Sequence, residues 1–180
     1  VPPHNLDAEA SLLGAMLLNE EPIGLAIEQQ LVPEDFYKPA HGHVFAAIKV
    51  LSQAADAVDV VTVADELRRH NLIDELGGLN FLLELQNATP SISSAGRYIR
   101  IVRDTSTLRR LIRGASEIAD IGYSAPADIK NAIDKAEQIV FDIGDEQIVD
   151  SLKKLHELTG TVAQILEDRY DAKSDVTGVR

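Results

Sequence analysis

The sequence predicts an all-α fold, in which a globular N-terminal helical domain is followed by a long antiparallel helical hairpin and a C-terminal linker helix. The composition supports this prediction, because 45% of the 180 residues are hydrophobic but only 4% are aromatic, so the core is aliphatic and suits helices. Apolar residues also recur at the spacing of a helix. Turn-forming residues separate the helical segments, as at Gly77-Gly78 and at Thr89-Pro90-Ser91.

The globular domain is predicted to span residues 1–92 and to consist of short helices. Asn5 or Asp7 is placed to cap the first helix with its side chain. Thr62 resembles the first residue of a capping box, which would start a later helix. The valine-rich residues 58–63 have strand propensity, but no partner strand is predicted nearby. They are therefore predicted to form a loop that leads into the later helix.

The hairpin is predicted to span residues 93–145, and its first arm, over about residues 94–122, would be roughly 40 Å long. Pro126 is placed to start the second arm. The first arm is predicted to carry a single apolar stripe, formed by Ile99, Val102, Leu108, Leu111, Ile112, Ala115, Ile118 and Ala119. The second arm is predicted to carry a seam with coiled-coil spacing, formed by Ile129, Ile133, Ala136, Val140 and Ile143.

The outer apolar positions of this hairpin need a partner, because a two-helix hairpin buries too little surface to be stable alone. Positions of this kind are Ile112, Ile118 and Ile139. A second copy of the hairpin can supply the missing surface, so we expect the chain to form oligomers. Residues 146–180 are predicted to form a polar joint, a linker helix and a tail, and the linker helix is expected to dock onto a neighbouring subunit.

A basic stretch in the first arm has two interpretations, and its residues are Arg97, Arg100, Arg103, Arg109, Arg110 and Arg113. One interpretation is a surface for DNA or an acidic partner, which makes a helical DNA-binding domain the rival function. The other is pairing with the acidic second arm or with a neighbouring subunit. The net charge of −12 favours the second interpretation, because a protein that coats nucleic acid needs a basic surface.

No catalytic, cofactor or metal site is predicted in the chain. The glycine-rich phosphate-binding motif of nucleotide-hydrolysing motors is absent, and the lack of cysteine fits a reducing, cytoplasmic compartment. His41 and His43 are interpreted as packing at a helix start rather than as metal ligands, because residues two apart do not share a helix face. None of the acidic side chains stands out as part of a catalytic pair, and most are predicted to lie on solvated faces. No apolar run is long enough to span a membrane.

Several blocks of sequence, in order along the chain, resemble the N-terminal region of the DnaB-type replicative helicases. The blocks are Pro2 to Gly14, Asp35-Phe36-Tyr37 with His41, His43, Val44 and Phe45, Asp59 to Leu67, Gly77-Gly78 to Leu85, Thr89-Pro90-Ser91, and Tyr98 to Arg103. Thr177-Gly178-Val179 resembles the start of the stretch that leads into the family's motor domain. The resemblance therefore covers the whole chain.

The resemblance implies a ring-shaped hexamer that unwinds DNA at the replication fork in the cytoplasm. The RecA-like motor, with its ATP and Mg, would lie beyond Arg180 and would make most of the DNA contacts. The present region would be the collar, whose hairpins pair as dimers within the ring and which binds a DnaG-type primase and a helicase loader. Family positions linked to primase correspond to Ile112, Ile118, Ala132 and Ile133, where Ala132 departs from a larger aliphatic residue.

Overall fold

The computed structural model describes residues 1–144, which form helices and no strand. Its helices are α1 (Leu6–Leu18), α2 (Glu21–Glu28), α3 (Pro39–Gln53), α4 (Val60–Arg69), α5 (Gly78–Asn87) and α6 (Ala95–Tyr123), with 3₁₀ helices η1 (Pro33–Asp35) and η2 (Ile92–Ser94). A further helix spans residues 129–144. The all-α prediction is confirmed for these residues, while the predicted linker helix and tail lie outside them.

The chain divides into two compact units between Ser116 and Glu117, within α6. The first unit contains α1 to α5 and most of α6, because Ile99 and Val102 of α6 are buried in the same core as the shorter helices. The second unit contains the end of α6 and the helix 129–144. The sequence-based division instead starts the hairpin at residue 93, before those two buried side chains.

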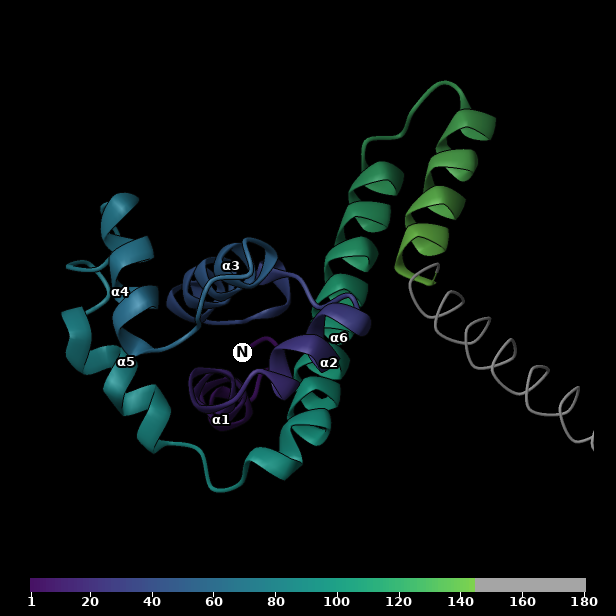
Figure 1. Ribbon diagram of the computed structural model, residues 1–180. Helices are drawn as coiled ribbons and strands as arrows, with labels where there is room; N and C mark the ends of the chain where they lie inside the picture. The colour runs from purple at the N-terminus through teal and green to yellow at the C-terminus, as the bar shows by residue number, and fades with distance from the viewer. Residues whose placement is uncertain (145–180) are drawn as a thin grey trace, which may run out of the picture. The chain divides into compact units, whose positions relative to one another are not determined.

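Helix α1 is the central element of the first unit. It packs against α2, α3 and α5, and every residue from Ser11 to Leu17 is buried (Figure 1). The surrounding core is aliphatic with few rings, as the composition predicts, and its fully buried members include Phe45, Ile48, Leu67, Leu82 and Ile99. The approach of α1 to α5 is so close that a Cβ atom on Gly14 would lie 2.0 Å from the Leu85 carbonyl oxygen.

The first residues of two helices can be compared with the capping residues that the sequence predicts. One prediction is confirmed and one is corrected. Asn5 caps α1 as predicted, since its Oδ1 accepts a 2.9 Å hydrogen bond from the Ala8 N–H. Helix α4 begins at Val60, so the prediction of a loop over 58–63 is wrong at its C-terminal end. Its cap is Asp59 rather than Thr62, which occupies the third helical position and accepts a 2.9 Å bond from the Asp59 N–H. Both residues suit a cap, but only Asp59 precedes Val60, the first apolar residue that α4 buries.

The hydrogen bonds of the Asp59 cap are expected to stabilise the fold measurably. Asp59→Ala is expected to lower the free energy of unfolding by about 1–2 kcal/mol, because the N–H groups of Val61 and Thr62 lose their acceptor. Urea denaturation followed by circular dichroism measures this loss. Asp65→Ala is the matched control on the same helix, since Asp65 makes only exposed ion pairs with Arg68 and Arg69 and should cost less than about 0.5 kcal/mol. Equal losses in the two variants would contradict the assignment of the cap.

Candidate functional site

Helix α6 has two apolar faces that point in different directions, so the prediction of a single stripe is wrong. Ile99 and Val102 are buried in the core of the first unit, whereas Leu108 and Ile112 are 47% and 51% exposed. A helix rotates by about 100° per residue, so Leu108 is turned by about 240° from the direction of Val102. The second apolar face, which we call the outer face (Leu108, Leu111 and Ile112), therefore points away from that core.

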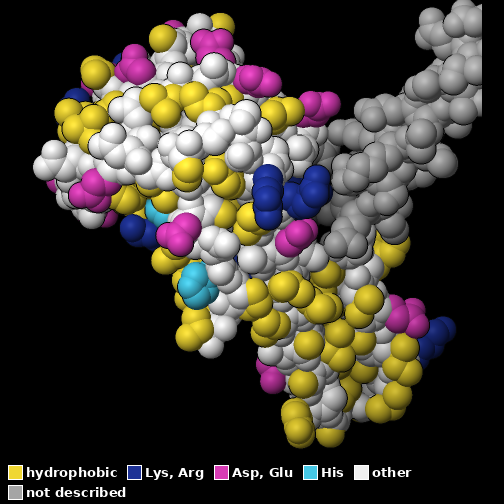
Figure 2. Space-filling model, turned by 90° about the horizontal axis from the view of Figure 1, so that it is seen from below, with side chains coloured by type: hydrophobic (Ala, Val, Ile, Leu, Met, Phe, Trp, Pro, Cys, Tyr) yellow, Lys and Arg dark blue, Asp and Glu magenta, His cyan; other side chains and the backbone are white. Residues whose placement is uncertain are grey.

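The predicted interface residues are accessible in the single chain. Ile112, Ile129, Ile133 and Val140 each have at least 51% of their surface exposed. Partial exposure is found for Ile118, Ala132 and Ile139. Figure 2 shows hydrophobic side chains gathered in broad patches on one face of the molecule. Because these side chains are about half exposed, full burial of each Leu or Ile would contribute roughly 1 kcal/mol, so several of them together can drive association.

The arginine stretch does not form one surface. Arg97, Arg100 and Arg113 are exposed, whereas Arg103, Arg109 and Arg110 are partly buried. The Nη1 atom of Arg109 donates a 2.9 Å hydrogen bond to the Pro3 carbonyl, and its Nη2 atom donates to the Asp35 carbonyl. Arg110 donates a 3.3 Å bond to the Thr107 hydroxyl of its own helix. Arg109 is thus used within the first unit, and a continuous basic surface for DNA is not favoured.

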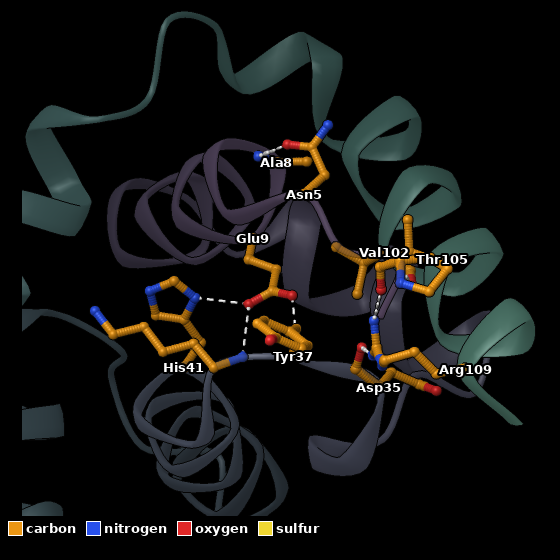
Figure 3. A network of polar contacts seen from close by, with 11 residues as sticks. Asn5, Ala8, Glu9, Asp35, Tyr37, His41, Val102, Thr105 and Arg109 are labelled. Atoms are coloured by element: carbon orange, nitrogen blue, oxygen red, sulfur yellow. Dashed lines mark hydrogen bonds and ion pairs between the residues drawn. The ribbon is translucent and has the colours of Figure 1, made fainter. Parts of the chain in front are cut away.

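A buried carboxylate lies at the centre of a polar network between α1 and the start of α3 (Figure 3). The Glu9 side chain is fully buried and accepts hydrogen bonds from the Tyr37 N–H at 2.7 Å and the Lys38 N–H at 3.4 Å. The Nδ1 atom of His41 lies 2.8 Å from Glu9 Oε2. Burial raises the pKa of Glu9, but the hydrogen bonds from His41, Tyr37 and Lys38 outweigh burial and lower it overall.

A second buried carboxylate joins η1 to the inner face of α6. The Oδ1 atom of Asp35 accepts a 2.7 Å hydrogen bond from the Ser106 hydroxyl, and Oδ2 accepts a 3.0 Å bond from the Val32 N–H. Both Asp35 and Ser106 are buried. Most acidic side chains are predicted to be solvated, and Glu9 and Asp35 are buried exceptions that the sequence analysis does not single out. A signal was present for Glu9, which precedes Leu12 and Leu13 by the three and four residues that separate neighbours on one helix face.

Of the two histidines, His41 has the packing role that the sequence favours, whereas His43 does not. His41 is buried, pairs with Glu9 and stacks on the Phe81 ring of α5 at a centroid distance of 6.0 Å. His43, two residues further along α3, is exposed on a different face of the helix. In residues 1–144, no three His, Cys, Asp or Glu side chains are grouped so that they could hold a metal ion. None of the described helices is long and apolar enough to cross a membrane.

The fold and this surface define a class of protein: a small helical domain that is extended by a long helix with an exposed apolar face. The chain belongs to the DnaB-like helicase N-terminal domain family, whose model matches residues 1–104.

Similar sequences are replicative DNA helicases. The chain is 32% identical over 179 residues to the replicative DNA helicase DnaC of Bacillus subtilis. The matched region covers 99% of this chain and 39% of that protein. The replicative DNA helicase DnaB of Geobacillus stearothermophilus is similar to the same extent, at 32% identity and 39% coverage of its own length. The chain thus spans about two fifths of the length of these relatives.

Similar solved structures confirm the fold. The crystal structure of the N-terminal domain of DnaB helicase from Mycobacterium tuberculosis matches with a TM-score of 0.75 and 38% identity, over 78% of this chain and 99% of that one. A DnaB-like replicative helicase described together with its interactions with primase matches with a TM-score of 0.63, over 84% of this chain and 35% of that one. Its 24% identity makes the second likeness informative about the fold alone.

Proposed function

We propose that this chain is the collar of a replicative DNA helicase, which pairs with a second copy of itself and offers a docking surface to a DnaG-type primase. The observation that carries the proposal is the outer face of α6, where Leu108, Leu111 and Ile112 are exposed on the side turned away from the core. Side chains of α1 to α5 face the opposite side of α6, so they do not cover this surface. The cover is therefore proposed to be another molecule.

Charge supports a second copy of the chain as that molecule. Helix α6 exposes Arg97, Arg100 and Arg113, and the helix 129–144 exposes Asp134 and Glu137 beside apolar residues at coiled-coil spacing. An apolar seam flanked by opposite charges is the pattern of helices that pair between chains. We propose that residues 93–145 act as this pairing hairpin, with Ile118, Ile129, Ile133, Ile139 and Val140 contributing to the seam.

A primase and a loader are proposed as partners because this chain belongs to the helicase family. A structurally similar helicase is described with its interactions with primase. The family resemblance of the sequence links Ile112, Ile118, Ala132 and Ile133 of this chain to primase. Because the chain covers 39% of the DnaC relative, we propose that DNA unwinding, with its ATP and Mg, belongs to the remaining part of proteins of this type. The collar would contribute assembly and recruitment, and a loader would be a further partner.

Self-association gives the next prediction. Ile112→Asp is expected to weaken association at least about tenfold, because a carboxylate would be buried in an apolar contact. Sedimentation velocity over a concentration series measures the change. Val61→Asp is the matched control, since Val61 is 71% exposed on α4 and lies outside the proposed hairpin. Neither variant should alter urea unfolding of the monomer. Equal weakening by both variants, or by neither, would refute the outer face as the pairing surface.

Primase recruitment is tested separately by titrating the chain with the C-terminal domain of a DnaG-type primase in isothermal calorimetry. We expect measurable binding to the unmodified chain and weaker binding to Ile118→Asp, with Val61→Asp unchanged. Binding that is the same in all three proteins would place the primase surface elsewhere. The absence of binding to the unmodified chain would refute recruitment while leaving self-association as a separate result.

A further inference from the structure

Arg109 joins segments of the first compact unit that are distant in sequence. Its guanidinium donates hydrogen bonds to the carbonyl of Pro3, before α1, and to the carbonyl of Asp35, at the end of η1. It also lies over the ring of Tyr37, 5.7 Å from the centroid. A guanidinium carries its donors in a rigid planar fork, so one Arg side chain can hold two carbonyls and an aromatic face together. Lysine has no such geometry.

The groups that receive Arg109 are held in place by other contacts. The His4 ring stacks on the Tyr37 ring at a centroid distance of 4.2 Å and an interplanar angle of 13°. The Tyr37 N–H is bound by the buried Glu9 carboxylate, and the Asp35 side chain is bound by Ser106 and Val32. Arg109 therefore contacts a surface that the fold has already ordered. Burial lowers the pKa of Arg109 overall, although the nearby carboxylates of Glu9 and Asp35 act in the opposite direction and favour its positive charge.

The position of these contacts along α6 is important. Ile99, Val102 and Ser106 attach the first part of α6 to the core, and Arg109 extends the attachment by about one turn. The exposed outer face begins at Leu108, in the same turn as Arg109. The Arg109 contacts are thus the attachment that lies beside the proposed pairing surface.

We infer that Arg109, Pro3, His4, Asp35 and Tyr37 form a clasp that fixes the direction in which α6 leaves the helical domain. In the closed state Arg109 of α6 is bound both to Pro3 in the N-terminal segment and to Asp35 at the end of η1. Opening the clasp leaves α6 attached through Ile99, Val102 and Ser106, so that its later turns gain freedom to swing. The inference deepens the proposed function, because the clasp would set the angle at which the outer face meets a second copy, but the clasp itself needs no partner.

Distance measurements between spin labels test this clasp directly. The chain contains no cysteine, so Gln53→Cys at the exposed end of α3 and Ser116→Cys on α6 give two defined label positions within the first unit. The labelled chain is diluted into excess unlabelled chain, so that only distances within one molecule are recorded by double electron–electron resonance. We expect one narrow distance in the otherwise unmodified chain. Arg109→Gln is expected to broaden it, and Arg100→Gln, an exposed arginine on the same helix, is the control that leaves it narrow.

A narrow, unchanged distance in a folded Arg109→Gln chain would overturn the clasp. If circular dichroism shows that Arg109→Gln does not fold, the distance is measured in His4→Ala instead. This variant removes an exposed ring from the N-terminal segment without opening the core. A broadened distance in His4→Ala supports the clasp, and an unchanged one overturns it. Repeating the measurement in Ile112→Asp separates the two proposals: a narrow distance in a monomeric chain means that the clasp holds without assembly.

Discussion

Gly14→Ala is expected to lower the free energy of unfolding by about 3 kcal/mol or more, because the added methyl group has no space between α1 and α5. Its Cβ atom would lie 2.0 Å from the Leu85 carbonyl oxygen and 2.1 Å from the Thr89 hydroxyl oxygen. The Leu85 atom belongs to the backbone, so a side-chain rotation does not relieve the contact. The two segments are also joined by hydrogen bonds, from the Ser11 hydroxyl to the Ala88 carbonyl and from the Thr89 hydroxyl to the Ser11 carbonyl.

Gly24→Ala is the matched control for this substitution. Gly24 lies inside α2, and a Cβ atom there would meet nothing within 4 Å. Because alanine favours the helix over glycine, this variant is expected to be more stable by about 0.5–1 kcal/mol. Urea denaturation is therefore expected to show that the free energy of unfolding shifts in opposite directions in the two variants. A Gly14→Ala variant as stable as the unmodified chain would show that α1 and α5 are further apart than described.

Glu9→Gln is expected to lower the free energy of unfolding by about 2–4 kcal/mol at neutral pH. The amide has the size of the carboxylate, but it replaces one acceptor by a donor in a site lined by the donors of Tyr37 and Lys38. It also removes the negative charge that faces His41 and Arg109. The loss therefore reports the network that links α1 to the start of α3.

The same variant has a defined pH dependence. The pKa of Glu9 is lowered in the folded state from its ordinary value of 4.5, so the unfolded chain binds the proton more readily. The stabilisation is therefore fully present above the unfolded pKa and is lost as the pH falls through the folded pKa. Urea denaturation at several pH values should show the difference between the unmodified chain and Glu9→Gln shrinking below about pH 4. Glu84→Gln, at an exposed position on α5, should show no comparable difference. A difference that is constant with pH would contradict a buried, ionised Glu9.

Local features of this fold could be predicted from the sequence. The Asn5 cap and the turn at Gly77-Gly78, where both φ angles are positive, depend on residues close in the chain. The capping residue of α4 was predicted three residues too late, because Asp59 and Thr62 are both good caps and the sequence does not show which one precedes the buried residues. Local side-chain chemistry thus predicts that a helix is present, but it places the first residue of the helix only to within about one turn.

Features that depend on tertiary packing were missed. The outer and inner faces of α6 both contain aliphatic residues, and only the position of the core shows that Val102 is buried while Leu108 is exposed. The burial of Glu9 requires donors from Tyr37 and Lys38, which come close only when η1 and α3 pack against α1. The blocks that carry the family resemblance contain Glu9, Tyr37 and Val102.

The measurement that tests the central proposal most directly is light scattering on the unmodified chain over a concentration series, with and without the C-terminal domain of a DnaG-type primase. We expect a mass that rises with concentration to at least twice the 19.6 kDa of the single chain, and a further increase when the primase domain is added. A mass of 19.6 kDa at every concentration, unchanged by the primase domain, would contradict the proposal that this chain is an assembly collar.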